Sequence, residues 1–499
     1  MEKLAIIELN TTNIKLLTVD TIKNKSYVIS NELSTPINLS KGFDEDEIIK
    51  SNITQDIVAI LNIYKRMIEA KEITNVLCVA CSFVKLATNQ NGFLNEIEGI
   101  TGFAFRVITP EDEINYVYSA AINTIGAPKA LVINVEEYST QFLVYNRRNV
   151  QNMHILPIGS VNLPKMVGEN INMESMRQFM ASELKSLDFL SNLEEEFDVI
   201  GFGAPFLNAG AIGRRARKYP LDVDHNYLLA KAEFEKVFDA IKPLESTKST
   251  KIKGVSVEDA KNLQAGLAIV GAVFGTINKS EIAISKTTKI DGLLLNTVVP
   301  ITQEKPITDN LGYSLQVISE YYDSKTKNAE QIYTISMILF KQLKVLHKLS
   351  RSFVRVLRVA SYLCQSGKRV DYYNNEKASF NIILNSKLYG ISHSELVLAG
   401  FVSLLREADN FNMPEWVKYR ELVSEEDLDA VKKLSCIIKI AESLDVTKFS
   451  VVTDINCDIL GDSVIMKTIT NGDASLEIKH GMLNAGEFKR AFGKNLEVL

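Results

Sequence analysis

Short blocks of apolar and polar residues alternate along the first 300 positions, a pattern typical of an α/β chain. Two of these apolar runs, Leu131–Val135 and Gln141–Tyr145, enclose a polar stretch from Glu136 to Thr140. Short apolar runs bounded by polar residues predict buried strands. We therefore expect a strand–loop–strand unit at 131–145, whose loop carries two carboxylates and no glycine.

Further elements follow from the same patterns. Short strands are expected within 4–38, and apolar residues recur with a helical period over 46–69. Thr109 and Pro110 suit the N-cap and first position of a helix. A helix crowded with small residues is expected at 256–278. Helices dominate beyond residue 325, and the last fifty residues alternate in a manner that predicts short strands.

Composition narrows the class of protein. The chain has 499 residues, which is too many for one core, so two to four domains are expected. A formal net charge of -5 gives no general attraction to nucleic acid or to an acidic membrane. Five scattered cysteines suit a reducing, cytoplasmic location, and no long apolar leader opens the chain.

The central loop and its neighbours resemble one enzyme family. INVEEYSTQF (133–142) resembles a phosphate loop of the pattern D-x-G-G-G-S-x-E, and the stretch at 80–113 resembles a second family segment that runs from A-T-S-A-L-R-E-A to an acidic helix start. PIGSVNLPK, FDVIGFGAPFLN and SKTTKIDGLL follow in the family's order, the last resembling S-x-x-G-L-R-E-G with Ile290 at the arginine. The chain is identified as a member of the exopolyphosphatase/guanosine pentaphosphate phosphohydrolase family.

The resemblance implies roles for particular residues. Glu113 stands at the family's general base, which activates the water that attacks a terminal phosphate. Without the resemblance, Glu111, Asp112 and Glu113 would be read only as complementing the helix dipole. Phosphate contacts are expected from the following residues: Lys15, Lys85, Ser139, Gly159, Ser160 and Gly203. Glu8 and Glu136 are candidate ligands for Mg²⁺, the cation that the family implies.

The phosphate loops depart from the family's chemistry. Asn134 stands at an aspartate, Gln141 at a glutamate, and Glu136, Glu137 and Tyr138 at three glycines. A Cβ at a glycine position blocks close approach of the backbone to a ligand. The two added carboxylates also repel a phosphate, by several kcal/mol at ~4 Å and an effective dielectric of ~20.

The helical half resembles the HD-like domain of longer family members, with its metal ligands replaced. Cys364 and Gln365 stand where the family has His-Asp, NNEKAS (374–379) has no histidine, and Leu405 replaces another. A transition metal is therefore not expected in this domain.

These observations predict a two-lobed fold of the actin/sugar-kinase type, related to ribonuclease H, followed by an all-α HD-like domain and a small α+β end. The expected divisions are 1–126 and 127–300 for the lobes, 301–325 for a linker, 326–446 for the HD-like domain and 447–499 for a β-rich subdomain.

Two functions remain open. Motif loss favours a binding or regulatory homologue with weak or lost hydrolysis. The alternative is an active exopolyphosphatase with Glu113 as base and a cation-bridged phosphate. The resemblance implies polyphosphate or a guanosine penta- or tetraphosphate as ligand and a homodimer as the assembly. Nucleic acid and membrane partners are not expected.

Overall fold

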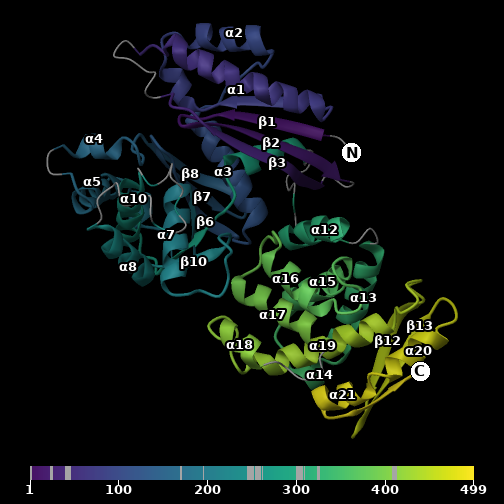
Figure 1. The fold of residues 1–499 in the computed structure, drawn as a ribbon. Helices are drawn as coiled ribbons and strands as arrows, with labels where there is room; N and C mark the ends of the chain where they lie inside the picture. Colours follow the sequence, from purple (N-terminus) through teal and green to yellow (C-terminus); the bar gives the residue numbers. More distant parts are fainter. Residues whose placement is uncertain are drawn as a thin grey trace. The chain divides into compact units, whose positions relative to one another are not determined.

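The computed structural model describes residues 3–22, 26–39, 47–168, 171–194, 196–243, 262–298, 309–322, 326–406 and 413–499, with single residues at 252, 255, 260 and 307 (Figure 1). The chain divides into two compact units. The first unit comprises Met1–Ala209 and Ala230–Thr308, and the second comprises Gly210–Leu229 and Asp309–Leu499.

The first unit opens with a five-stranded sheet in the order β3-β2-β1-β4-β5. Its strands are β1 (Lys3–Leu9), β2 (Asn13–Ile22), β3 (Ser26–Pro36), β4 (Asn75–Ala80) and β5 (Arg106–Val107). Helices α1 (Ser51–Ala70) and α2 (Gln90–Thr101) cover one face (Figure 1). Alternate residues of β1, such as Ala5 and Ile7, share a core with Ile57 and Leu61 of α1. The face of β1 formed by alternate residues thus packs against the apolar face of α1, whose residues recur with the helical period.

A six-stranded sheet in the order β10-β11-β9-β6-β7-β8 follows. Its strands are β6 (Lys129–Val135), β7 (Thr140–Asn146), β8 (Asn149–Leu156), β9 (Asp198–Phe202), β10 (Tyr227–Ala230) and β11 (Glu281–Ile284). The helices around it are α3 (Pro110–Thr124), α4 (Leu163–Val167), α5 (Met173–Lys185), α6 (Asp188–Ser191), α7 (Ala204–Ala216), α8 (Lys231–Ile241), α10 (Leu263–Thr276) and α11 (Lys289–Val298).

The two sheets repeat one topology. In the first, β1, β2 and β3 form an antiparallel meander and β4 lies parallel beside β1. In the second, β6, β7 and β8 form the meander and β9 lies parallel beside β6. The turn between β1 and β2 therefore corresponds to the loop between β6 and β7. The predicted two-lobed repeat is confirmed.

Helix α3 begins as predicted. The Thr109 hydroxyl accepts from the Asp112 amide and the Asp112 carboxylate accepts from the Thr109 amide, with Pro110 at the first position. This is a capping box that satisfies two backbone donors at the helix start. Helix α3 packs very closely on α11, because a Cβ at Gly292 would lie 1.8 Å from the backbone oxygen of Tyr116. Only glycine permits this approach.

The second unit is mainly helical, with a small sheet at its end. Its helices are α12 (Asn310–Tyr322), α13 (Thr326–Gln342), α14 (Lys344–His347), α15 (Phe353–Leu363), α16 (Glu376–Asn385), α17 (His393–Leu405), α18 (Met413–Tyr419), α19 (Asp427–Ser443), α20 (Ser475–Met482) and α21 (Ala485–Phe492). Strands β12 (Val452–Ile459), β13 (Ser463–Thr470) and β14 (Asn495–Val498) pair in that order.

Two expectations from the sequence need correction. The predicted linker at 301–325 contains helix α12, because Leu311 and Leu315 are buried at helical spacing. The strand pattern of the last fifty residues is wrong over α20 and α21, where Phe488 is buried on an amphipathic helix. The helix expected at 256–278 is described from residue 263, and most positions before it lie outside the described residues.

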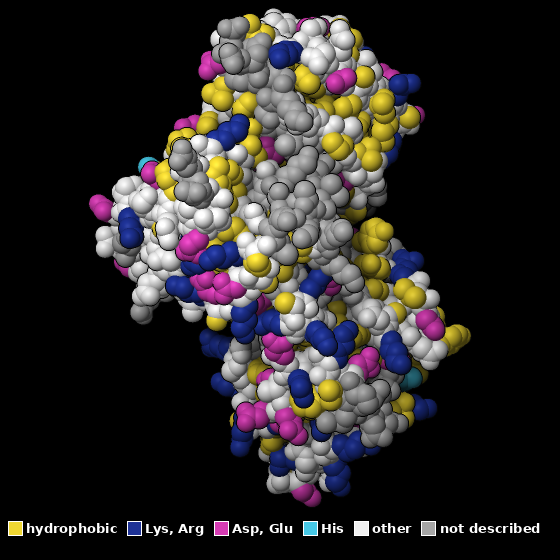
Figure 2. Space-filling model, turned by 60° about the vertical axis from the view of Figure 1, so that its left-hand side comes forward, with side chains coloured by type: hydrophobic (Ala, Val, Ile, Leu, Met, Phe, Trp, Pro, Cys, Tyr) yellow, Lys and Arg dark blue, Asp and Glu magenta, His cyan; other side chains and the backbone are white. Residues whose placement is uncertain are grey.

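Surface charge is mixed. Lysine and arginine side chains lie interspersed with aspartate and glutamate on the face seen in Figure 2, in keeping with the small net charge of -5. Within the part of the chain that the structure describes, no helix is long and apolar enough to cross a membrane.

Candidate functional site

The loops at the ends of the central strands enclose a cleft of about 790 Å³ in the first unit. Its walls come from the β1–β2 turn, the segment after β4, the start of α3, the β6–β7 loop and the starts of α7, α10 and α11. Ligands of α/β folds bind where loops leave the carboxyl ends of strands. The cleft is also within the size range of small-molecule sites. It is therefore the candidate functional site.

The cleft brings together most of the residues singled out from the sequence. Its lining includes Glu8, Lys15, Lys85, Glu113, Glu136, Ser139, Ser160 and Gly203. Gly159 lies behind the lining, where a Cβ would meet the backbone of Glu137 at 2.4 Å. The Ser160 and Val161 amides donate to the carbonyls of Glu136 and Glu137. Gly159 thus has a packing role beneath the loop, in place of the expected phosphate contact.

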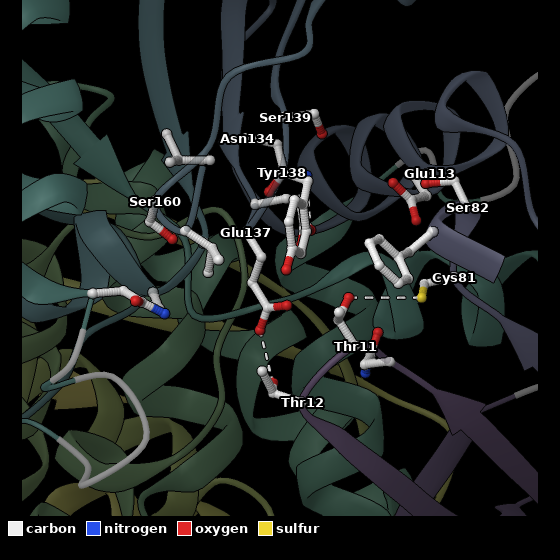
Figure 3. Close-up of a pocket in the computed structure, with 18 of the residues that line it drawn as sticks. Thr11, Thr12, Cys81, Ser82, Glu113, Asn134, Glu137, Tyr138, Ser139 and Ser160 are labelled. Atoms are coloured by element: carbon white, nitrogen blue, oxygen red, sulfur yellow. Dashed lines mark hydrogen bonds between the residues drawn. The ribbon is translucent and has the colours of Figure 1, made fainter. Parts of the chain in front are cut away.

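Tyr138 occupies a position where the resembling loop has glycine. Its ring packs against Phe83 with 5.0 Å between ring centroids. Figure 3 shows Tyr138 and Glu137 projecting from the loop into the cleft. The Glu137 carboxylate accepts a hydrogen bond from Thr12 Oγ1 at 2.7 Å, which joins the β6–β7 loop to the β1–β2 turn. Side chains therefore fill space that a glycine loop would leave for a ligand.

The buried carboxylate of Glu113 is held by an amide network. Gln141 Nε2 donates to Glu113 Oε2 at 3.1 Å and to Ser139 Oγ at 3.3 Å. Asn134 Nδ2 donates to Gln141 Oε1 at 3.1 Å and to Glu136 Oε1 at 3.0 Å. The two amide side chains that stand at family carboxylate positions thus donate hydrogen bonds to the remaining carboxylates, Glu113 and Glu136.

Lys289 is the residue that sequence reasoning missed. It is buried at the first position of α11, and its Nζ lies 3.5 Å from Glu8 Oε1, 3.6 Å from Glu113 Oε1 and 3.9 Å from Glu136 Oε2. A signal was present, because Lys289 stands at the leucine of the motif S-x-x-G-L-R-E-G. A charged residue at an apolar family position points to a new ionic partner.

Burial and charge act in opposite directions on these groups. Burial alone would lower the pKa of Lys289, but Glu113, Glu136 and Glu8 raise it well above its ordinary value, so the ammonium stays charged. Burial raises the pKa of Glu113, an effect that Lys289 opposes and Glu136 reinforces. Burial also raises the pKa of Glu137, against the hydrogen bond from Thr12.

Cys81 also lines the cleft but is not a plausible nucleophile. Burial raises the pKa of its thiol to about 12. The thiolate is the reactive form of cysteine, and its population at neutral pH is negligible at such a pKa. Covalent chemistry at Cys81 is therefore not supported.

Mg²⁺ does not fit the two carboxylates proposed to bind it. Magnesium requires oxygen ligands at about 2.0–2.1 Å in octahedral geometry. An ion between Glu8 and Glu136 would lie within roughly 4 Å of the Lys289 ammonium, a repulsion of about 8 kcal/mol at an effective dielectric of ~20. Among the described residues, no group of three or more His, Cys, Asp or Glu side chains is arranged to hold a metal. The structure gives Glu8 and Glu136 an ammonium as partner.

Several donors at the cleft are uncommitted. Neither Lys15 nor Lys85 makes an ion pair with any other residue that the structure describes, and both line the cleft. Ser160 and Asn208 are 7% and 6% exposed and line it as well. Ammonium, hydroxyl and amide groups of this kind suit a ligand rich in oxygen acceptors.

A second buried charge cluster lies in the helical unit. Arg406, 1% exposed, pairs with Glu442 and donates from Nη2 to Asn375 Oδ1 at 2.8 Å. Gln365 Nε2 donates to Glu442 Oε1 at 2.6 Å, and the Cys364 thiol lies 3.8 Å from the same oxygen. Cys364, Gln365 and Asn375 stand at positions where the resembling domain has metal ligands. In this structure they lie together, and the positive charge beside them is the Arg406 guanidinium.

Comparison with known proteins agrees with this picture. A model described as the Ppx/GppA phosphatase family matches residues 18–299, more than half of the chain. The guanosine-5'-triphosphate,3'-diphosphate pyrophosphatase of Aeromonas salmonicida (strain A449) is 20% identical over 412 residues, which span 82% of this chain and 81% of that protein. The protein of the same description from Vibrio atlanticus (strain LGP32) is 19% identical and spans 82% of each chain.

Solved structures show the fold. A Ppx/GppA family member from Aquifex aeolicus gives a TM-score of 0.53 at 22% identity, covering 61% of this chain and 99% of its own. An exopolyphosphatase from Cytophaga hutchinsonii ATCC 33406 gives a TM-score of 0.54 at 15% identity, covering 60% and 98%. The first unit therefore has the two-lobed, actin-like fold of these proteins. With the family model matched over both lobes, the chain belongs to the Ppx/GppA phosphatase family.

Proposed function

We propose that this protein binds a phosphorylated ligand in its cleft and that its hydrolysis of that ligand is weak or lost, which leaves a binding or regulatory role. Polyphosphate and guanosine pentaphosphate are the ligand classes in question. Relatives are described as an exopolyphosphatase and as a guanosine-5'-triphosphate,3'-diphosphate pyrophosphatase. The family membership supports a phosphorylated ligand, and the chemistry of the cleft supports the loss of turnover.

The proposal rests on the contacts of the two Glu113 carboxylate oxygens. One oxygen lies 3.6 Å from Lys289 Nζ and the other accepts from Gln141 Nε2 at 3.1 Å. A general base must hold the proton of the attacking water within hydrogen-bond reach. Each Glu113 oxygen thus already has a partner inside the cleft, and that partner competes with a water for the carboxylate.

The alternative is an active phosphohydrolase with Glu113 as base. Its support is that Glu113 lies in the cleft with Ser139 and two uncommitted lysines. Phosphoryl transfer depends on positioning and charge neutralisation more than on covalent chemistry by the protein. Turnover measured on the purified chain separates the two functions.

Three further features belong to the same proposal. The helical unit derives from an HD-like domain, because Cys364, Gln365 and Asn375 converge on Arg406 and Glu442. The lobes divide near residue 126, since the first sheet ends at Val107 and the second begins at Lys129. The location is cytoplasmic, in keeping with five cysteines that are all unpaired.

Lys15→Ala with Lys85→Ala is expected to weaken the binding of tripolyphosphate at least tenfold, or about 1.4 kcal/mol. The reason is the loss of two charge-assisted contacts to phosphate oxygens. Calorimetric titration at fixed ionic strength measures the effect.

The matched control is Lys231→Ala with Lys236→Ala. It removes the same charge from exposed positions on α8, outside the cleft, and should change the Kd less than twofold. Equal weakening by both pairs would mean that only overall charge attracts the probe, and the cleft would lose its assignment as the binding site.

A further inference from the structure

We propose that the Lys289 ammonium is the resident cation of this cleft, supplying among three carboxylates the positive charge that would otherwise come from a divalent ion. Ligand binding in the cleft then needs no metal. The second statement rests on the proposed function, whereas the first does not.

The three carboxylates come from separate parts of the first unit. Glu8 lies on β1, Glu113 in the first turn of α3, and Glu136 directly after β6. Their oxygens lie 3.5, 3.6 and 3.9 Å from Lys289 Nζ. These distances exceed the 2.7–2.9 Å typical of one direct charge-assisted hydrogen bond. The ammonium therefore lies between the three carboxylates and is not committed to a direct hydrogen bond with one of them.

The backbone holds Lys289 at this centre. A Cβ at Gly292, three residues along α11, would lie 1.8 Å from the Tyr116 carbonyl oxygen, so α11 and α3 are in close contact. That contact fixes Lys289 relative to Glu113, which is three residues before Tyr116. A lysine at a helix N-terminus is opposed by the helix dipole. The carboxylates therefore supply the interaction that keeps it there.

The single ammonium of Lys289 compensates only part of the negative charge of the three carboxylates. Glu8 is 3% exposed, and its Oε1 has no hydrogen bond to any other residue that the structure describes. Among the described residues, the cation that pairs with Glu8 is Lys289, at 3.5 Å. Among the described residues, the three carboxylates as placed around the ammonium do not form a metal site. Without the ammonium their charge has no compensation, and oxygen donors of this kind then attract a divalent cation.

The first statement is tested by titrating the protein with Mn²⁺ in the absence of phosphate. Electron paramagnetic resonance measures the concentration of free Mn²⁺. The wild-type chain should bind no Mn²⁺ at 1 mM at this site. Lys289→Gln should acquire one site that fills at a tenth of that concentration or less, and adding Glu136→Gln should abolish it. Lys286→Gln removes the same charge from an exposed position nearby and should behave as wild type.

A wild-type chain that binds one Mn²⁺ below 1 mM and loses it in Glu113→Gln would overturn the proposal. So would a folded Lys289→Gln variant that gains no site. If Lys289→Gln fails to fold, Lys289→Arg retains a cation and is expected to stay folded and metal-free. Mn²⁺ bound by that variant or by wild type would equally refute the proposal.

Tripolyphosphate binding tests the second statement. Its Kd for wild type should change less than twofold between EDTA and 1 mM Mn²⁺, while Lys289→Gln should bind at least tenfold more weakly in EDTA and recover with Mn²⁺. Wild-type binding that requires Mn²⁺ would contradict metal independence. Absence of tripolyphosphate binding under every condition would count against the proposed function and leave the Mn²⁺ result standing.

Discussion

Replacing Arg406 with methionine is expected to destabilise the helical unit by about 3–5 kcal/mol. The guanidinium is 1% exposed and is the charged partner of Glu442, which also accepts from Gln365. Removing one member of a buried pair leaves the other charge without compensation in a poorly solvating interior. Asn375 Oδ1 would lose its donor as well. Urea unfolding followed by Trp416 fluorescence, the chain's single tryptophan, reports on this unit.

Two comparisons make the Arg406 experiment specific. Lys467→Met breaks the exposed pair with Asp458, in the same unit, and should cost at most about 1 kcal/mol. The double change Arg406→Met with Glu442→Met should lose less stability than the sum of the two single changes. A loss below 1 kcal/mol for Arg406→Met would show that the guanidinium is not the central cation of the helical unit.

Replacing Glu136 and Glu137 together with glutamine is expected to strengthen tripolyphosphate binding tenfold or more. Both side chains line the cleft, and two unit charges at 4 Å interact by about 4 kcal/mol at an effective dielectric of 20. Glutamine keeps the shape of each side chain and an acceptor for Thr12. Without the Glu136 charge, the electrostatic potential around Lys289 is also more positive, which favours binding of an anion.

The control for this pair is Glu96→Gln with Glu98→Gln on α2. Both positions are exposed and lie outside the cleft, and the net charge changes by the same amount. The control should move the Kd less than twofold in calorimetry. Weaker binding by Glu136→Gln with Glu137→Gln would mean that these carboxylates support the ligand through a bridging group.

Local patterns predicted most of the fold, because strand and helix periods report burial directly. The apolar runs around Glu136 to Thr140 became β6 and β7, and Thr109 capped α3. The predicted type of element was wrong where a helix is short and amphipathic. In α20 and α21 only a few residues, such as Phe488, are buried, so a helical period has too few repeats to exceed an alternating pattern.

The candidate site was predictable only in part. The family resemblance singled out Glu8, Glu113 and Glu136, and all three line the cleft. Lys289 was not found, because its partners lie far away in the sequence and no local pattern joins them. Arg406 was missed for the same reason: its pairing with Glu442 joins α17 to α19 across 36 positions.

We propose that the cleft of this Ppx/GppA family member retains its ligand without turning it over. Phosphate release from polyphosphate and from guanosine pentaphosphate, measured by malachite green with and without Mg²⁺, tests it most directly. We expect wild type and Glu113→Gln to be indistinguishable from the rate without protein. Wild-type turnover in the ordinary enzymatic range of about 1–10³ s⁻¹, abolished by Glu113→Gln, would contradict the claim.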